Sequence, residues 1–118
     1  MKPVFIGGCD RSGTTLLGSM IGAHADCLTA PESQFIINSL AKSYLADSGR
    51  IDTAAAFEAM RTDPRFGIWG VDLGQFHDLP ENTAKSFPAL IKWIVQQYGR
   101  LNGKPSPSLW IDHTPWNV

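Results

Sequence analysis

The sequence has few cysteines, almost no net charge and no long apolar run. Its 118 residues include two cysteines, Cys9 and Cys27, whose spacing fits neither a metal site nor a disulfide framework. The formal net charge is −1, without a basic cluster, which excludes a surface built for nucleic acid. The apolar run after Lys2 is too short for a signal peptide or a membrane segment. We therefore expect a soluble cytoplasmic domain in which both cysteines are small apolar residues.

Hydrophobic spacing predicts short strands and helices in an α/β domain. Residues 4–8 and 109–112 have the β-branched and aromatic content of buried strands. Residues 14–23 place Leu16, Leu17, Met20 and Ile21 at helical spacing directly after the first strand. The beginning of the chain is therefore expected to fold as strand, tight turn and helix.

Three further helices are expected downstream. One begins after Pro31 and stops at Gly49, and a second is capped by Asp52 and ends before Asp63-Pro64. The strongest apolar repeat, at i, i+3, i+4 and i+7, covers residues 87–101. Residues 62–82 are rich in Gly, Pro and Asp and are expected to form a long loop.

The turn between the first strand and the first helix suits an anion. Such a turn presents unpaired backbone N–H groups and the positive end of the helix dipole at one point. Gly8, followed after four residues by Gly13-Thr14-Thr15, has the spacing of a nucleotide-binding P-loop. Thr14 stands where a nucleoside triphosphatase has lysine, so a cation must come from elsewhere in the loop.

Arg11 supplies that cation. A guanidinium with the hydroxyls of Ser12, Thr14 and Thr15 around it suits a terminal phosphate held without a metal ion. Asp10 would repel an anion, so we expect its carboxylate either to point outward or to orient the guanidinium of Arg11. The loop therefore predicts phosphate binding without magnesium.

The stretch GGCDRSGTTLLGSMIGAHADC, residues 7–27, resembles the 5′-phosphosulfate-binding loop of the sulfotransferase family. Its Arg-Ser-Gly-Thr-Thr form is closest to the Golgi and bacterial branches. The resemblance implies a P-loop NTPase-like parallel sheet with flanking helices and 3′-phosphoadenylyl sulfate as the sulfate donor. Around the donor's 5′-phosphate it places Arg11, Ser12, Gly13, Thr14 and Thr15.

Two other residues receive catalytic roles from this resemblance. Glu32 follows Arg11 at a spacing similar to that of the catalytic glutamate in the tyrosylprotein branch, which implies a general base. The alternative is a first-turn carboxylate favoured by the helix dipole. WIDHTPWN, residues 110–117, resembles a Lys-Thr-Pro-x-Asn segment, and His113 stands at its lysine. The resemblance places His113 near the bridging oxygen, with Trp110 and Trp116 as candidate borders of an acceptor pocket.

The resemblance implies that residues 1–118 form the N-terminal part of a sulfotransferase-like domain. The family's 3′-phosphate-binding segment has no counterpart here, and only two strands are expected. We therefore expect an incomplete sheet, with self-association or a missing C-terminal half, and an isolated chain that is inactive.

The implied function is sulfuryl transfer to a hydroxyl or amine of a small-molecule, peptide or carbohydrate acceptor. Two alternatives remain open. A P-loop nucleotide kinase or phosphotransferase would need magnesium and the lysine that the loop lacks. A non-catalytic phosphate-binding fragment would need neither.

Overall fold

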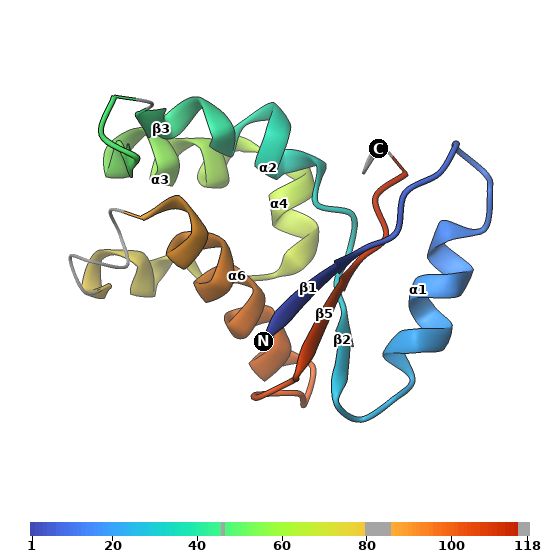
Figure 1. Ribbon diagram of the computed structural model, residues 1–118. Coiled ribbons are helices and arrows are strands. Elements are labelled where there is room, and N and C mark those ends of the chain that lie inside the picture. Colours follow the sequence, from blue (N-terminus) through green and yellow to red (C-terminus); the bar gives the residue numbers. More distant parts are fainter. Residues whose placement is uncertain (46, 80–85, 116–118) are drawn as a thin grey trace.

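The computed structural model describes residues 1–45, 47–79 and 86–115, so Trp116 lies outside the described residues. A parallel sheet separates helix α1 from the other helices (Figure 1). The elements are β1 (Lys2–Phe5), α1 (Thr14–Gly22), β2 (Cys27–Thr29), α2 (Gln34–Asn38), a 3₁₀ helix (Leu40–Ser43), β3 (Tyr44–Leu45), β4 (Arg50–Ile51), α3 (Thr53–Thr62), α4 (Pro64–Trp69), a second 3₁₀ helix (Leu73–Asp78), α6 (Phe87–Leu101) and β5 (Leu109–Asp112).

The central strand of the sheet is β5, which pairs in parallel with β1 on one side and β2 on the other. Val4 and Thr29 both lie opposite Ile111. The expected α/β class is confirmed, but the sheet has three strands where the sequence indicated two. Because parallel strands end at one edge, the segments that follow β1, β2 and β5 meet there.

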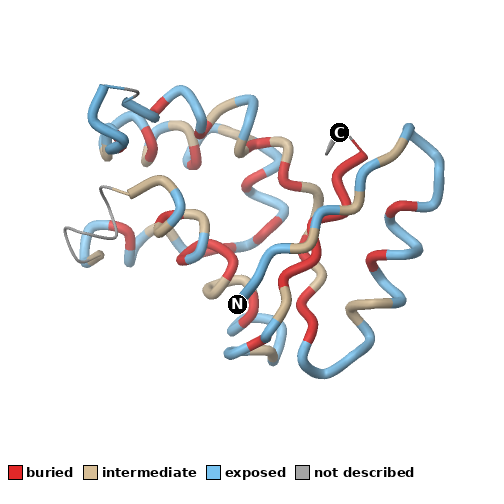
Figure 2. Tube along the Cα trace, in the orientation of Figure 1, coloured by how far each residue is buried: buried red, intermediate tan, exposed pale blue. Residues whose placement is uncertain are grey.

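Helix α1 approaches the sheet through its small residues. A Cβ atom added at Gly18 would lie 3.0 Å from the His113 Cβ, and one added at Gly22 would lie 2.1 Å from the Thr29 Oγ1. The Thr29 hydroxyl donates a hydrogen bond of 2.6 Å to the Gly18 carbonyl. The apolar side chains at helical spacing lie outward instead, and Met20 is 66% exposed. Figure 2 accordingly shows α1 largely exposed.

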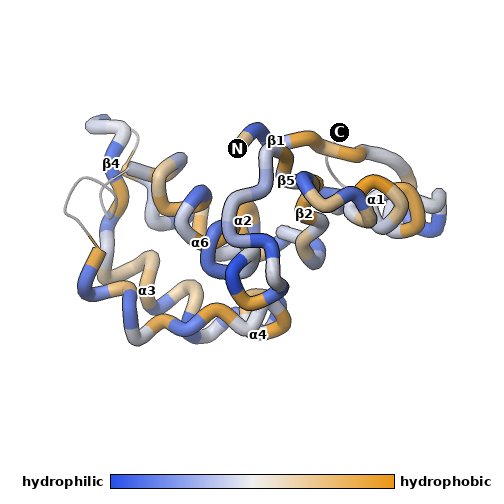
Figure 3. Tube along the Cα trace, turned by 90° about the horizontal axis from the view of Figure 1, so that it is seen from below, coloured by the Kyte–Doolittle hydropathy of each residue, from blue (hydrophilic) through white to orange (hydrophobic). Residues whose placement is uncertain are grey.

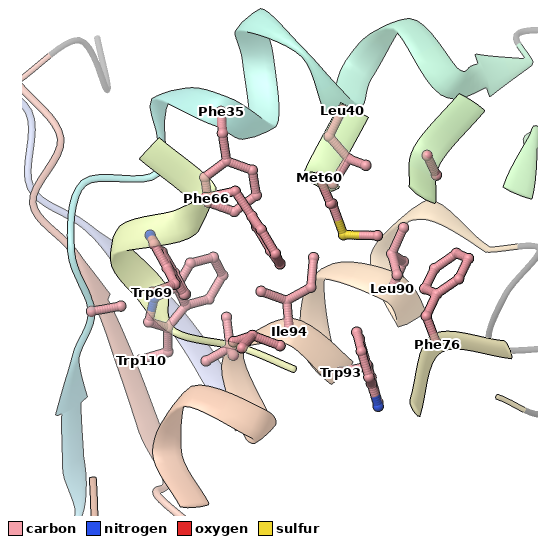
Figure 4. Close-up of a cluster of buried hydrophobic side chains, with 14 of the residues drawn as sticks. Phe35, Leu40, Met60, Phe66, Trp69, Phe76, Leu90, Trp93, Ile94 and Trp110 are labelled. Carbon is pink, nitrogen blue, oxygen red and sulfur yellow. The ribbon is translucent and has the colours of Figure 1, made fainter. Parts of the chain in front are cut away.

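The main hydrophobic core lies on the other side of the sheet, between the strands and α2, α3, α4 and α6 (Figures 3 and 4). Phe35 of α2 packs edge-to-face against Phe66 and Trp69 of α4, with ring centroids 5.1 and 5.4 Å apart. Helix α6 buries Leu90 and Ile94 almost completely against them. This apolar contact fixes the segment between β2 and α2 relative to the sheet.

The sequence interpretation fails in two stretches. The single helix expected between Pro31 and Gly49 is instead α2, a 3₁₀ helix and the start of the β3–β4 hairpin. The stretch expected as a loop contains α4, which begins at Pro64, and a further 3₁₀ helix. Helix α3 follows the sequence expectation, since the Asp52 carboxylate accepts a hydrogen bond of 3.0 Å from the Ala55 N–H. None of the helices in the described ranges is long and apolar enough to cross a membrane.

Candidate functional site

Residues 6–13 join β1 to α1 and include two left-handed backbone positions; we call them the phosphate loop after the site that the sequence predicts there. Arg11 has φ 61° and Gly13 has φ 89°. A left-handed φ is uncommon outside glycine and costs about 1–3 kcal/mol where it is imposed, so the fold holds Arg11 there against its local preference. Successive N–H groups in such turns form concave anion sites.

The first turn of α1 keeps its N–H groups available. Gly13, at the N-cap, has no side chain to accept from them, and the first intrahelical bond joins the Leu17 N–H to the Gly13 carbonyl over 3.0 Å. The positive end of the helix dipole is therefore directed into the loop. A Cβ atom added at Gly8 would lie 2.7 Å from the Ser12 Oγ and 3.3 Å from the Thr14 Cγ2, so the Ser12 hydroxyl would have to rotate away.

The loop and Glu32 line one hollow of about 740 Å³. Its described lining is Asp10, Arg11, Gly13, Thr14, Thr15, Leu16, Ser19, Glu32 and Pro115. The structure thus brings together most of the residues that the sequence singled out for donor binding and Glu32. Ser12 is not in this lining, because its hydroxyl lies over Gly8. Asp10 and Arg11 are both exposed, and within the described ranges no ion pair joins them.

The segment after β5, residues 113–115, forms hydrogen bonds with the backbone on both sides of the hollow. On one side, the Gly8 N–H donates to the Pro115 carbonyl over 3.1 Å. On the other, the Ser33 N–H, directly after Glu32, donates to the Thr114 Oγ1 over 2.8 Å. Asp112, the last residue of β5, accepts a hydrogen bond from the Thr114 hydroxyl over 2.6 Å.

These buried polar residues were missed in the sequence, although a signal existed. Ser33 follows the candidate base directly, and Asp112 and Thr114 stand at the end of a strand, where parallel sheets place their sites. Ser33, Asp112 and Thr114 are all buried, with exposed fractions of 6%, 2% and 2%. Nothing in the sequence showed that they would contact one another.

His113 lies outside the lining of the hollow. Its buried ring packs against Gly18 of α1, and among the described residues its Nδ1 has no hydrogen-bond partner. Its role at the bridging oxygen stays a prediction. Trp110 is buried and borders a separate apolar cavity of about 470 Å³ beside β1 and α6.

A second, more polar hollow of about 610 Å³ adjoins the first. It is lined by Asp10, Ser33, Gln34, Ile37, Asn38, Arg65 and Thr114. Asp10 borders both hollows, and Ser33 places the second one next to Glu32. The edge of the sheet therefore offers two adjoining spaces with a carboxylate at the boundary.

A comparison with family models finds one match, to the sulfotransferase family, over residues 3–118. The match includes the phosphate loop, Glu32 and the whole segment after β5. Comparisons with curated proteins and with solved structures give no significant match.

Proposed function

The chain belongs to the sulfotransferase family, and from this premise we propose that it takes a sulfuryl group from 3′-phosphoadenylyl sulfate. Family membership indicates sulfuryl transfer in general. The donor, the acceptor class, a hydroxyl or an amine, and the residue roles are our proposal. The observation that carries it is the hollow shared by the phosphate loop and Glu32.

The loop suits the 5′-phosphate of this donor. Arg11 supplies a planar cation, Thr14 and Thr15 supply hydroxyls, and the first turn of α1 supplies N–H groups. Together they hold negative charge through charge-assisted hydrogen bonds. The volume of the hollow falls within the range of pockets that take small ligands, about 300–1,000 Å³.

Glu32 acts as the general base in the proposed reaction. Its carboxylate takes the proton of the acceptor hydroxyl or amine as the acceptor atom forms its bond to sulfur. The bond from sulfur to the bridging oxygen breaks in line, and its electron pair stays on the phosphate. Arg11 and the loop N–H groups stabilise the charge that collects there. By analogy with phosphoryl transfer, positioning supplies much of the rate.

The acceptor is proposed to enter through the second hollow. That space shares Asp10 with the donor hollow and is lined by Ser33, the residue next to Glu32, so an acceptor in it would lie close to the proposed base.

A nucleotide kinase remains the second candidate, because the loop has P-loop spacing. It would require magnesium and a lysine at the position of Thr14. Calorimetric titration with adenosine 3′,5′-bisphosphate and with magnesium-ATP separates the two. Preference for the bisphosphate supports our proposal, preference for magnesium-ATP supports the kinase, and binding of neither contradicts both.

Arg11→Ala tests the loop directly. Removing a charge-assisted hydrogen bond should weaken bisphosphate binding by about 1.5–3 kcal/mol, roughly 10- to 150-fold, with little effect on folding. Arg100→Ala is the matched control, because Arg100 is an exposed arginine in the last turn of α6. Equal affinities of Arg11→Ala and the parent protein would remove Arg11 from the site.

A further inference from the structure

The peptide bond between Glu32 and Ser33 is held at both of its polar groups. Its N–H donates to the Thr114 Oγ1 over 2.8 Å, and its carbonyl accepts from the Trp69 Nε1 over 3.3 Å. Thr114 and Trp69 are 81 and 37 residues away in sequence from their partners. Two contacts from different parts of the fold therefore fix the plane of this peptide, which includes the Cα atom that carries the Glu32 side chain.

The contact with Thr114 belongs to a closed set of hydrogen bonds. The Thr114 hydroxyl and N–H donate to the Asp112 Oδ1 over 2.6 and 3.0 Å, and the Ser33 hydroxyl donates to the Asp112 Oδ2. The Ser33 and Thr114 hydroxyl oxygens lie 3.2 Å apart. Both hydroxyl groups act as donors in these bonds, so both hydroxyl hydrogens are directed toward Asp112. The Thr114 oxygen is then left with lone pairs for the Ser33 N–H.

Burial makes this arrangement specific. The exposed fractions of Ser33, Asp112 and Thr114 are 6%, 2% and 2%, so water has little access to replace a lost bond. A buried donor without a partner is unfavourable, which penalises other positions of the Glu32–Ser33 peptide. The following residue, Pro115, accepts from the Gly8 N–H of the phosphate loop. Residues 112–115 therefore set the position of Glu32 relative to the loop.

We infer that Asp112, Thr114 and Ser33 are positioning residues that hold Glu32 at the donor hollow. The inference rests on the proposed function, because it gives these residues a role through the proposed base. Thr114 contacts the peptide of Glu32, and Asp112 acts through Thr114 and Ser33. If these three residues had only a structural role, each polar group would need a hydrogen-bond partner and nothing more. As positioning residues they also hold Glu32, so loss of one hydroxyl displaces the Glu32 side chain.

Thr114→Val tests the inference, because valine keeps the shape of threonine and removes the hydroxyl. The readout is the side-chain carboxyl ¹³C signal of Glu32 in glutamate-labelled protein, assigned by its loss in Glu32→Gln. The sequence has only three glutamates, Glu32, Glu58 and Glu81, so the spectrum is simple. In the parent protein, saturation with adenosine 3′,5′-bisphosphate should shift this signal. In Thr114→Val the shift should fall by about half or more, with bisphosphate affinity within about threefold.

Thr114→Ser and Thr62→Val complete the design. Serine keeps the hydroxyl, so Thr114→Ser should restore most of the shift. Thr62→Val makes the same chemical change on α3, where the hydroxyl bonds only the Glu58 carbonyl of its own helix, and should leave the Glu32 signal unchanged. Wherever sulfuryl transfer is measurable, Thr114→Val should lower kcat by roughly 10- to 100-fold with donor KM nearly constant.

A Glu32 signal that responds in Thr114→Val as in the parent protein would overturn the inference. Equal losses in Thr114→Val and Thr114→Ser would do the same, because the hydroxyl would then be irrelevant. Failure of the parent protein to bind the bisphosphate would instead contradict the proposed function. Hydrogen exchange at the Ser33 amide stays readable in that case, and it should accelerate about tenfold or more in Thr114→Val.

Discussion

Gly22→Ala places a methyl group where α1 meets β2, and the structure sets the size of the effect. The added Cβ would lie 2.1 Å from the Thr29 Oγ1 and 2.7 Å from the Thr29 Cβ. Rotation of the threonine can move the hydroxyl but not the Cβ, so the helix or the strand must shift. Rotation also breaks the 2.6 Å bond from the hydroxyl to the Gly18 carbonyl.

The energy contributions of this substitution add up to a loss of stability. Overpacking costs about 1–3 kcal/mol, and the lost hydrogen bond costs about 0.5–1.5 kcal/mol. Alanine gains at most about 1 kcal/mol over glycine in a helix, and less at Gly22 because it is the last residue of α1. We expect Gly22→Ala to lower the free energy of unfolding by about 1–4 kcal/mol.

Urea unfolding followed by tryptophan fluorescence measures this loss. Gly67→Ala is the matched control, since Gly67 lies within α4 and a Cβ there has nothing within 4 Å. It should raise the free energy of unfolding by about 0.5–1 kcal/mol. If Gly22→Ala unfolds at the parent midpoint, or if Gly67→Ala loses as much stability, the close approach of α1 to the sheet does not limit this position.

Two other predictions concern the base and a helix cap. In a form with measurable transfer, Glu32→Gln should lower turnover by roughly 10²- to 10⁴-fold with bisphosphate affinity unchanged. Turnover equal to that of the parent protein would exclude Glu32 as the base; the helix-dipole alternative does not apply, because α2 begins at Gln34 with Ser33 as its N-cap. Desolvation raises the pKa of Asp63, but hydrogen bonds from the Ser39 hydroxyl and from the Arg65 and Phe66 N–H groups outweigh it and leave the pKa below its usual value. A lowered folded pKa stabilises the fold above the unfolded pKa, near 4, and this contribution is lost as the pH falls through the folded value. Asp63→Asn should therefore cost about 0.5–1 kcal/mol by urea unfolding at pH 6 and less at pH 3, and an equal cost at both would contradict the carboxylate's role.

The strands and helices with strong local signals could be predicted. β5 and α6 follow the expected ranges because their apolar residues repeat at the spacing of the element. β2 was missed because its three residues show almost no pattern, and among the described strands it pairs only with β5, far along the chain. α4 could have been found, since Asp63-Pro64 is an N-cap followed by proline at the first helical position.

In the candidate site, too, local features could be predicted from the sequence and long-range contacts could not. The phosphate loop is local, so a site could be predicted there from one stretch, and that prediction remains to be tested. The structure shows that Arg11 and Glu32 line one hollow. The positioning residues could not be identified, because their contact depends on the register of β5 against β2. The face of α1 that meets the sheet could not be predicted either. The apolar residues of this helix suggest a buried face, yet Gly18 and Gly22 have no side chains and so permit the closest packing, which decides the face that meets the sheet.

The central place of β5 also bears on synthesis. β1 and β2 leave the ribosome early, but neither pairs with the other, and both need β5 as a neighbour. At about 5–20 residues per second, the wait between β2 and β5 is on the order of 4–16 s. Helix α6, which supplies much of the core, is made just before β5, so β1 and β2 stay without their neighbouring strand until the core residues are also present. The addition of β5 completes the three-stranded sheet, and the residues that follow it then contact both Ser33 and Gly8, so the hollow between Glu32 and the loop forms only after the sheet is complete.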